Sequence, residues 1–473
     1  MYAGRVYYRM DGNFMYKINF KHPLHIHFIG IGGISMSGLA EILLKEHFII
    51  SGSDSRESAL TRKLADLGAI IFYGQAAENI PGDTQLVVYT AAVQPDNPEL
   101  MEAGRRKLPT LTRAELLGQI MDNYSRSIGV SGTHGKTTTT SMITHILLEA
   151  DMDPTVSVGG ILKSIDGNIR VGNSEVFLTE ACEYTNSFHH FTPRYALILN
   201  IEEDHMDFFK DLNEIRSSFA TFAAKVPPEG TVILNGEIEH HEEITRGLPS
   251  RIVTYGLTPS NEYYATDVRF HAQGYASFSF MHENHCLGTI ELHVPGMHNV
   301  SNAVASAALA IEMGVPFEDI AKALAGFGGT ARRFEYKGQL HGITIIDDYA
   351  HHPTEISATL EAARKCSHER LVCVFQPHTY TRTRAFLTDF AKALSAADLV
   401  ILADIYAARE KNTIGISSLD LLQELEKQGT ECYYFPSFDE IENFLLKKCM
   451  NGDLLITMGA GDILQVGEHL LGQ

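Results

Sequence analysis

The chain has 473 residues, too many for a single hydrophobic core, so we expect roughly two to four domains. Acidic residues outnumber basic ones by 58 to 38, and a formal charge of −20 argues against a general affinity for nucleic acid or anionic membranes. The six cysteines form no Cys-X-X-Cys pair and no apolar run approaches the roughly 18 residues of a membrane span, so we expect a cytoplasmic protein with reduced thiols.

The first ordered unit is a strand, a glycine turn, a helix and a second strand. Residues 25–29 predict a strand, 30–33 a tight turn, 35–45 a helix and 48–51 a strand that leads to Asp54; a further strand is expected at 86–89. Glycines in such a turn admit a pyrophosphate against a helix N-terminus. Ser35 stands where a dinucleotide fingerprint has Gly or Ala, which argues against NAD. Residues 1–23 have little periodicity, so translation from Met15 rather than Met1 is a hypothesis that an intact mass would test.

The sequence is organised around residues 129–140, Gly-Val-Ser-Gly-Thr-His-Gly-Lys-Thr-Thr-Thr-Thr. They follow an apolar run and open an amphipathic helix, an arrangement typical of a phosphate-binding loop. The strict pattern has four residues between its first Gly and Gly-Lys, whereas Gly129 leaves five. We therefore predict a variant loop that binds ATP, with a solvent-facing Lys136 on the outer phosphates and Thr137 on Mg²⁺.

Acidic residues follow two predicted strands of the central region. A strand at 176–179 delivers Glu180, and one at 195–200 delivers the acidic segment 202–207, which contains His205. Carboxylates beside a phosphate loop suit Mg²⁺, but the spacing alone leaves a solvated acidic turn equally open. Asn299 and Asn302 begin an alanine-rich helix, where helix capping and base recognition both remain possible roles.

A further α/β unit follows the segment 327–334. Strands are expected at 344–346, 371–375, 399–402 and 454–457, with helices that start at residues 353, 384, 419 and 439. Polar residues follow these strands, a position more typical of a site than of an ordinary surface.

Several motifs, in the same order, resemble the Mur ligase family. They are Gly-Thr-His-Gly-Lys-Thr-Thr-Thr at 132–139, Glu-Ala-Cys-Glu at 180–183, Asn-Ile-Glu-Glu-Asp-His-Met-Asp at 200–207 and Gly-Met-His-Asn-Val-Ser-Asn-Ala at 296–303. The resemblance covers nearly all of the chain beyond residue 23. It implies an α/β fold of three domains: a Rossmann-like domain for a UDP-sugar over 1–124, a central P-loop ATPase-type domain over 125–328, and a Rossmann-like domain for the amino acid over 329–473.

The resemblance also implies roles for individual residues. The implied ATP contacts are Gly132, Thr133, His134, Gly135, Lys136, Thr137, Thr138, Asn302, Arg333 and Asp348. Thr137 and Glu180 would hold one Mg²⁺, and His205 another. The implied substrate contacts are Gly32, Gly33 and Asp54 for the UDP-sugar, and Tyr349, His351, His378 and Arg382 for the carboxylate and the amine. The implied catalytic set is Lys136, Glu180, His205, His351 and Arg382, with His351 as a candidate base.

The resemblance implies, as an expected activity, ligation of L-alanine to the carboxylate of UDP-N-acetylmuramate through an acyl phosphate, in peptidoglycan precursor synthesis. An alternative within the family joins a preformed murein peptide to the same UDP-sugar. A nicotinamide-dependent oxidoreductase and a nucleotide-gated binding protein are the rivals from other classes. The oligomeric state is left open between a monomer and a homodimer. Residues 219–221 lack the lysine that bridges metals as a carbamate in many relatives, and Gln75 and Thr379 also depart from the family pattern.

Overall fold

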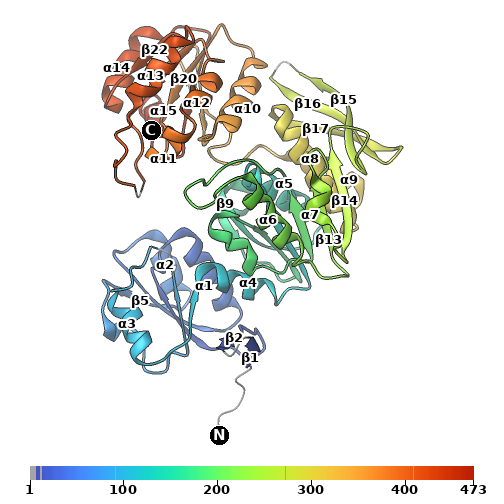
Figure 1. Cartoon of the computed structure of the whole chain (residues 1–473), viewed down its shortest axis with the longest axis vertical. Coiled ribbons are helices and arrows are strands. Elements are labelled where there is room, and N and C mark those ends of the chain that lie inside the picture. The colour runs from blue at the N-terminus through green and yellow to red at the C-terminus, as the bar shows by residue number, and fades with distance from the viewer. Residues whose placement is uncertain (1–6, 11–12, 91, 272, 409) are drawn as a thin grey trace.

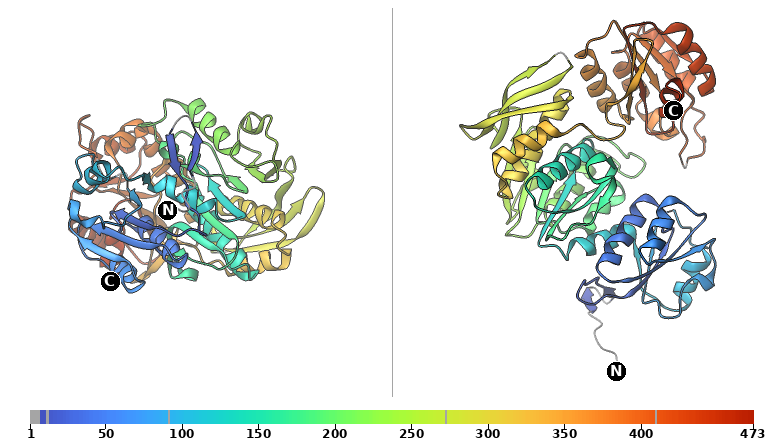
Figure 2. Two further views of the ribbon diagram at one scale, coloured as in Figure 1. Left: turned by 90° about the horizontal axis from the view of Figure 1, so that it is seen from below. Right: turned by 180° about the vertical axis from the view of Figure 1, so that it is seen from behind.

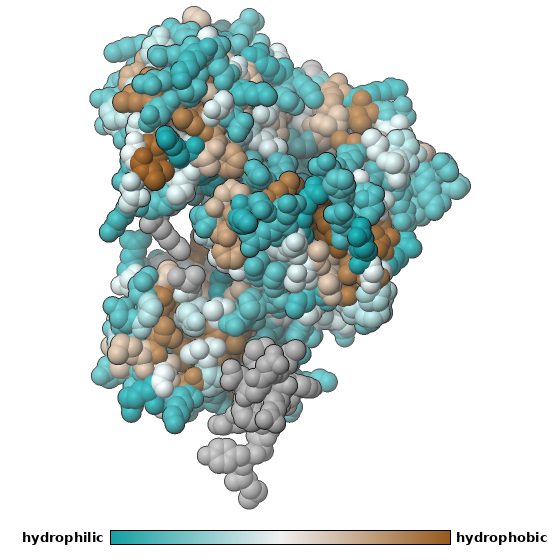
Figure 3. Space-filling view, viewed as in Figure 1, coloured by the Kyte–Doolittle hydropathy of each residue, from teal (hydrophilic) through white to brown (hydrophobic). Residues whose placement is uncertain are grey.

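The computed structural model describes residues 7–10, 13–90, 92–271, 273–408 and 410–473. Three α/β units follow one another along an arc, from the N-terminal unit at the bottom of Figure 1 to the C-terminal unit at the top. The view from behind shows the same arrangement (Figure 2). In the space-filling view the surface is hollowed between the top and bottom units (Figure 3). The expected α/β fold of three domains is confirmed. Before the first unit, β1 (Tyr7–Met10) pairs antiparallel with β2 (Asn13–Tyr16).

The N-terminal unit is a parallel sheet in the order β5-β4-β3-β6-β7. The predicted strands at 25–29 and 86–89 are present, while the strand after α1 runs later than expected and includes Asp54 itself. The elements are β3 (His25–Ile29), α1 (Ile34–Lys45), β4 (Ile49–Asp54), α2 (Ala59–Asp66), β5 (Ile70–Tyr73), η1 (Ala77–Asn79), β6 (Leu86–Tyr89), α3 (Pro98–Arg105), β7 (Thr110–Thr112) and α4 (Arg113–Met121).

The central unit is a sheet in the order β10-β9-β11-β8-β12-β13-β14-β15-β16-β17. From β9 to β15 it is parallel, and antiparallel pairing of β10, β16 and β17 extends it at both ends. The strands of this unit at 155–162 and 167–170, and those that follow residue 200, were not predicted. The strands are β8 (Arg126–Ser131), β9 (Thr155–Leu162), β10 (Gly167–Arg170), β11 (Val176–Glu180), β12 (Tyr195–Ile198), β13 (Thr231–Asn235), β14 (Arg251–Gly256), β15 (Tyr263–Phe270), β16 (Tyr275–His282) and β17 (His285–Pro295).

Two long helices of this unit, α5 (Lys136–Glu149) and α8 (Met297–Glu312), are mostly buried and share one hydrophobic core. The alanine-rich sequence of α8 permits this close packing, because small side chains let helices approach. The remaining helices are η2 (Lys163–Ile165), η3 (Tyr184–His190), α6 (Leu212–Ala223), α7 (His241–Thr245) and α9 (Phe317–Gly326).

The C-terminal unit is a sheet in the order β18-β19-β23-β20-β21-β22, in which only β18 is antiparallel to its neighbour. A helix was expected to start at residue 384, and this position is wrong. One helix, α11, ends at Ala385, and a second, α12, starts at Leu387 after Phe386, whose backbone angles are not helical. The elements are β18 (Glu335–Leu340), β19 (Ile343–Asp348), α10 (Pro353–Arg364), β20 (Arg370–Phe375), α11 (Tyr380–Ala385), α12 (Leu387–Leu394), β21 (Leu399–Leu402), α13 (Ser418–Lys427), β22 (Cys432–Tyr434), α14 (Phe438–Lys448), β23 (Asp453–Met458) and α15 (Leu464–Leu470).

The two junctions between units differ in chemistry. One hydrophobic cluster continues from Phe28 of the N-terminal sheet to Phe177 and Phe222 of the central unit. The C-terminal unit has clusters of its own, and the contacts to the central unit described below are ion pairs and hydrogen bonds. No helix among the described residues is both long and apolar enough to cross a bilayer.

Candidate functional site

The glycine loop between β8 and α5 turns on two residues with positive φ. Gly132 has a φ of +147° and Gly135 a φ of +82°, which residues with side chains rarely adopt. A Cβ on Gly135 would lie 2.9 Å from Asn302 Oδ1, and one on Gly132 would lie 2.9 Å from Leu199 Cβ. Both positions therefore require glycine, and α5 begins directly after the second of them.

Lys136 lies differently from the prediction. We expected a solvent-facing lysine, and this is wrong, because only 16% of its side chain is exposed. Its Nζ donates to Glu183 Oε2 at 2.9 Å, to the Thr133 carbonyl at 3.2 Å and to the Gly132 carbonyl. Burial alone would lower the pKa of Lys136, but the Glu183 carboxylate holds it above its ordinary value. An anion that enters here would compete with Glu183 for this ammonium group.

A cavity of about 190 Å³, here called the loop cavity, lies beside this lysine and is lined by the three predicted metal ligands. Thr137 comes from α5, Glu180 from the end of β11 and His205 from the segment after β12. They meet because β11, β8 and β12 are parallel neighbours. Hydroxyl and carboxylate oxygens suit Mg²⁺, whereas imidazole is an uncommon ligand for it. The donor set therefore fits Mg²⁺ at Thr137 and Glu180 better than at His205.

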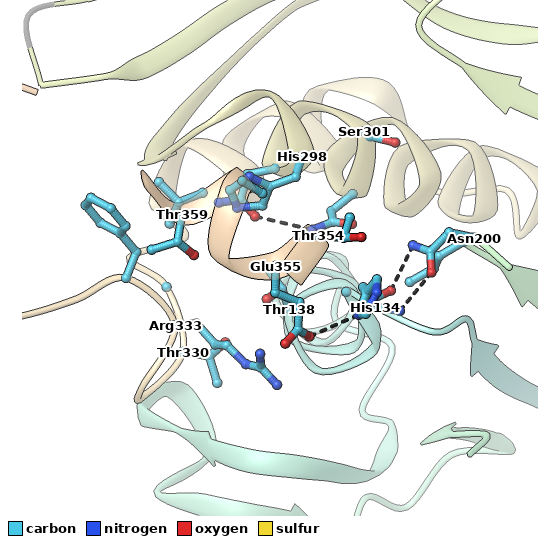
Figure 4. A pocket seen from close by; sticks show the side chains of 18 of the residues that line it. His134, Thr138, Asn200, His298, Ser301, Thr330, Arg333, Thr354, Glu355 and Thr359 are labelled. Carbon is cyan, nitrogen blue, oxygen red and sulfur yellow. Dashed lines mark hydrogen bonds and ion pairs between the residues drawn. The ribbon is translucent and has the colours of Figure 1, made fainter. Parts of the chain in front are cut away.

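A second cavity of about 240 Å³, the linker cavity, adjoins the loop cavity and lies between α8 and the C-terminal unit (Figure 4). Arg333 and Glu355 extend into it in Figure 4. Six predicted ATP contacts line it: His134, Gly135, Thr138, Asn302, Arg333 and Asp348. The sequence left capping and base recognition open for the two asparagines of α8. Asn299 Nδ2 donates to the Pro295 carbonyl at 2.7 Å, and Asn302 Nδ2 to Asn299 Oδ1 at 3.3 Å, while both line the cavity.

Two titratable groups of the linker cavity are strongly perturbed by burial. Burial raises the pKa of Asp348 to about 6, although its oxygens accept the N–H groups of Phe334 at 2.7 Å and Ala350 at 2.8 Å. Burial lowers the pKa of His298 to about 4, so this imidazole is neutral at pH 7. The sequence analysis gave His298 no role, although it stands directly before Asn299 in a motif that was noticed.

His134 connects the glycine loop to the C-terminal unit. Its Nδ1 lies 3.1 Å from Glu355 Oε1 of α10, and its Nε2 lies 3.5 Å from Glu202 Oε2. Burial opposes protonation of this imidazole, but the two carboxylates outweigh burial and raise its pKa to about 9. Glu355 also accepts the His351 N–H at 3.0 Å, so one carboxylate holds two predicted site residues. Glu355 was not predicted. Its position four residues after His351, at the start of a helix, could have indicated that the two residues lie close together.

Two of the four residues predicted to contact the carboxylate and the amine, His378 and Arg382, line a third cavity of about 490 Å³, the arginine cavity. It shares Asp204 and His205 with the loop cavity. Arg382 lies across the domain junction from Asp204, with Nη2 2.8 Å from Oδ1, and its Nη1 donates to His378 Nδ1 at 3.1 Å. Burial lowers the pKa of His378 to about 4. Asp204, like Glu355, was not assigned a role from sequence.

Tyr349 and His351 belong to the short segment between β19 and α10. His351 lines the loop cavity, and its Nδ1 lies 3.0 Å from the Tyr349 carbonyl, so Nδ1 carries the proton and Nε2 the lone pair. Burial lowers the pKa of His351 to about 4, against the effect of Glu355. The Tyr349 ring stacks under Arg333, whose guanidinium carbon lies 5.2 Å from the ring centroid.

The remaining predicted residues lie in the N-terminal unit, away from these three cavities. Gly32 and Gly33 form the turn after β3, and the Gly32 N–H donates to Asp54 Oδ2 at 2.8 Å. They occupy the carboxyl edge of the parallel sheet, where ligands bind in such folds. Among the described residues, the cavities above include no part of this edge.

One group of potential metal ligands was not predicted. Nitrogen and oxygen atoms of His134, Glu202 and His352 lie within 4.8 Å of one another. His352 Nδ1 accepts the Thr354 N–H, and its Nε2 lies 3.0 Å from the Glu203 carbonyl, so both ring nitrogens are engaged. His134 is also held as a cation, and a protonated imidazole has no lone pair to offer a metal ion. This group is therefore a set of polar contacts between two domains and does not fit a metal ion.

Comparisons with known proteins match all three units. Family models described as "Mur ligase family, catalytic domain", "Mur ligase middle domain" and "Mur ligase, glutamate ligase domain" match residues 25–125, 130–310 and 332–461. A UDP-N-acetylmuramate–L-alanine ligase of Agathobacter rectalis is 60% identical over 97% of this chain and all of its own length. The enzyme of the same name from Lachnospira eligens is 55% identical over 97% of this chain and all of its own.

Solved structures also match this chain over most of its length. The crystal structure of a UDP-N-acetylmuramate–alanine ligase from Thermotoga maritima matches with a TM-score of 0.77 at 30% identity, covering 95% of this chain and 98% of that one. A murein peptide ligase from Psychrobacter arcticus matches with a TM-score of 0.68 at 24% identity, covering 95% and 98% of the two chains, and shows the fold alone.

Proposed function

The chain belongs to the Mur ligase family, and from that premise we propose that it joins L-alanine to the carboxylate of UDP-N-acetylmuramate while converting ATP to ADP and phosphate, as a step of peptidoglycan precursor synthesis. We place its domain boundaries after residues 124 and 328 and assign it to the cytoplasm. The full-length relatives with this activity in their names support alanine over a preformed peptide as the second substrate.

The observation that carries the proposal is the order of the three cavities. The linker cavity shares His134, Gly135 and Arg333 with the loop cavity, and the loop cavity shares Asp204 and His205 with the arginine cavity. A nucleotide whose base lies in the linker cavity would direct its phosphates along the glycine loop to Lys136. Its terminal phosphate would then face a carboxylate held near Arg382. This is the arrangement that phosphoryl transfer to a carboxylate requires.

The chemistry follows from the charges of these residues. A carboxylate is a poor acyl donor, so the γ-phosphoryl group moves to it first and gives an acyl phosphate; the amine then forms the C–N bond as phosphate leaves. Lys136 and Arg382 offset the repulsion between the two anions. A magnesium ion held by Thr137 and Glu180 would add positive charge at the transferring phosphoryl group.

His351 is suited to orienting the amine. Its lone pair is on Nε2 because Nδ1 faces the Tyr349 carbonyl, and it is neutral at pH 7 because burial lowers its pKa to about 4. Such an imidazole accepts a hydrogen bond well but is a weak base. We therefore assign His351 the orientation of the alanine amine, while the departing phosphate, which leaves with an unprotonated and strongly basic oxygen, takes a proton from the nitrogen.

The test is phosphate release by the purified protein with ATP, Mg²⁺, UDP-N-acetylmuramate and L-alanine, each omitted in turn, with the mass of the product determined. Release that needs all four, and a product heavier by one alanyl residue, is the expected result. If phosphate is released only when a murein tripeptide takes the place of alanine, the second substrate is the peptide and not alanine. No release with either would refute the ligase proposal.

A further inference from the structure

A fully buried carboxylate lies beneath the carboxyl edge of the N-terminal sheet. Glu99 is in the first turn of α3, has an exposed fraction of 0%, and belongs to none of the cavities described above. A buried carboxylate is costly unless its oxygens are well paired. Its partners therefore indicate what it holds in place.

All hydrogen-bond partners of the Glu99 carboxylate donate to it. Oε2 accepts from Ser53 Oγ at 2.6 Å and from His27 Nε2 at 3.2 Å. Oε1 accepts from Asn79 Nδ2 at 2.7 Å and from the Ala76 N–H at 3.3 Å. Burial raises the pKa of Glu99, but the hydrogen bonds from His27, Ser53 and Asn79 outweigh burial and hold it below its ordinary value. The group is therefore an ionised acceptor at neutral pH.

These bonds join the two loops on either side of Asp54. Ser53 precedes Asp54, and its carbonyl accepts the N–H groups of Gly30 and Ile31 in the glycine turn. Asn79 and Ala76 belong to the loop 74–79, whose first N–H donates to the Asp54 carbonyl at 2.9 Å. One carboxylate thus fixes the distance between the glycine turn and the loop 74–79.

The same helix turn holds the loop at a second point. Asn97, the N-cap of α3, donates through Nδ2 to Gln75 Oε1, and its Oδ1 accepts the Glu99 N–H at 2.9 Å. Gly74, Gln75 and Glu78 of the loop are exposed, whereas Asn97 and Glu99, which hold it from α3, are buried. This pattern is typical of a binding loop positioned by a rigid scaffold.

We propose that Glu99 is a positioning residue for the nucleoside diphosphate part of the substrate: it sets the loop 74–79 against the glycine turn, so that both contact the same ligand. The inference rests on the proposed function, because it takes the ligand at this edge to be the UDP-sugar. Glu99 itself touches no ligand and acts through the two loops.

The test exchanges donor and acceptor across the bond between Glu99 and Asn79. Asn79→Asp places a second carboxylate against Glu99 and should displace the loop, whereas the double variant Asn79→Asp/Glu99→Gln restores one donor and one acceptor at unchanged volume. Glu102→Gln is the matched control, since Glu102 lies on the same helix and pairs at the surface with Arg105. The measurements are KM for UDP-N-acetylmuramate and for ATP, the affinity for UDP by calorimetry, and the urea unfolding midpoint.

We expect Asn79→Asp to raise KM for the UDP-sugar and weaken UDP binding about tenfold, with KM for ATP unchanged. The double variant should recover part of that loss, because it restores the bond between the two side chains but leaves the Gly74 carbonyl without its donor and the Ala76 N–H without its acceptor. Unchanged UDP affinity in Asn79→Asp, or a double variant that binds UDP no better than the single variant, would overturn the proposal. So would an equal rise of both KM values with a lower unfolding midpoint, which indicates a purely structural role. Calorimetry with UDP needs no turnover, so a wild-type protein that binds UDP without ligating would refute the ligase function and leave the role of Glu99 still decided by these variants.

Discussion

Replacing Lys136 by methionine removes the ammonium group and keeps most of the aliphatic side chain. Lys136 Nζ lies 2.9 Å from Glu183 Oε2, and the two side chains are 16% and 3% exposed. The variant therefore removes the expected phosphate contact and at the same time leaves a buried carboxylate without its cation. Loss of activity alone would not separate these two effects.

The magnitudes of the two effects differ. Removing one partner of a buried ion pair costs about 3–5 kcal/mol of unfolding free energy. His205 Nε2 lies 3.6 Å from Glu183 Oε1 and can replace part of the lost charge, so we expect the lower value, about 3 kcal/mol. With a urea dependence of about 3 kcal/mol per molar, the unfolding midpoint falls by about 1 M. Loss of a cation at the transferring phosphoryl group should lower kcat by about 10²–10³.

The double variant Lys136→Met/Glu183→Gln separates folding from catalysis. It removes both charges, so its unfolding midpoint should return close to that of the wild type while turnover stays low. The chain has no tryptophan, so unfolding is followed by far-ultraviolet circular dichroism. If Lys136→Met turns over within about tenfold of the wild type, the phosphate role of Lys136 is wrong. If the double variant is no more stable than the single one, Glu183 is not the group left unpaired.

Three other perturbations have distinct expected results. Gly135→Ala forces a residue with a φ of +82° to carry a Cβ 2.9 Å from Asn302 Oδ1, and should raise KM for ATP more than KM for the UDP-sugar in steady-state kinetics. Asp204→Asn frees Arg382 from its cross-domain ion pair of 2.8 Å, and should increase proteolytic cleavage at the domain junction in the absence of substrates. The folded-state pKa of His134 is about 9, above about 6.5 in an unfolded chain, so the stability that it contributes is complete below about pH 6.5 and is lost as pH rises through 9. The unfolding free energy of the wild type, measured in urea, should fall toward that of His134→Gln over this range, by up to about 3 kcal/mol; a constant difference would exclude the charged contact.

The fold and much of the candidate site could be predicted because both depend on short-range patterns. The glycine loop, the acidic segments after β11 and β12, and the polar segment after β19 are each continuous in sequence. Parallel strands bring such segments to one edge, which is why Thr137, Glu180 and His205 line one cavity. Their role as metal ligands came from the family resemblance and stays a prediction.

The residues that sequence reasoning missed act across long separations. Glu355 contacts His134, which lies 221 residues earlier, and Arg382 contacts Asp204, which lies 178 residues earlier. No periodicity or motif carries information about which side chains meet when two domains pack. The burial of Lys136 was missed for the same reason: Glu183 reaches it from the segment between β11 and η3, and a glycine loop by itself indicates an exposed lysine.

The two junctions between domains indicate which part of the chain moves during turnover. The N-terminal and central units share one apolar cluster, and separating them would expose large side chains such as Phe28 and Phe177. At the other junction the central and C-terminal units meet through His134 with Glu355 and through Asp204 with Arg382. Water can solvate these charges once the units separate, and phosphate or carboxylate can replace either acid, so this junction can open without exposing a large apolar surface and close again around an anion. The substrates can therefore take the places of Asp204 and Glu355 when the C-terminal unit closes.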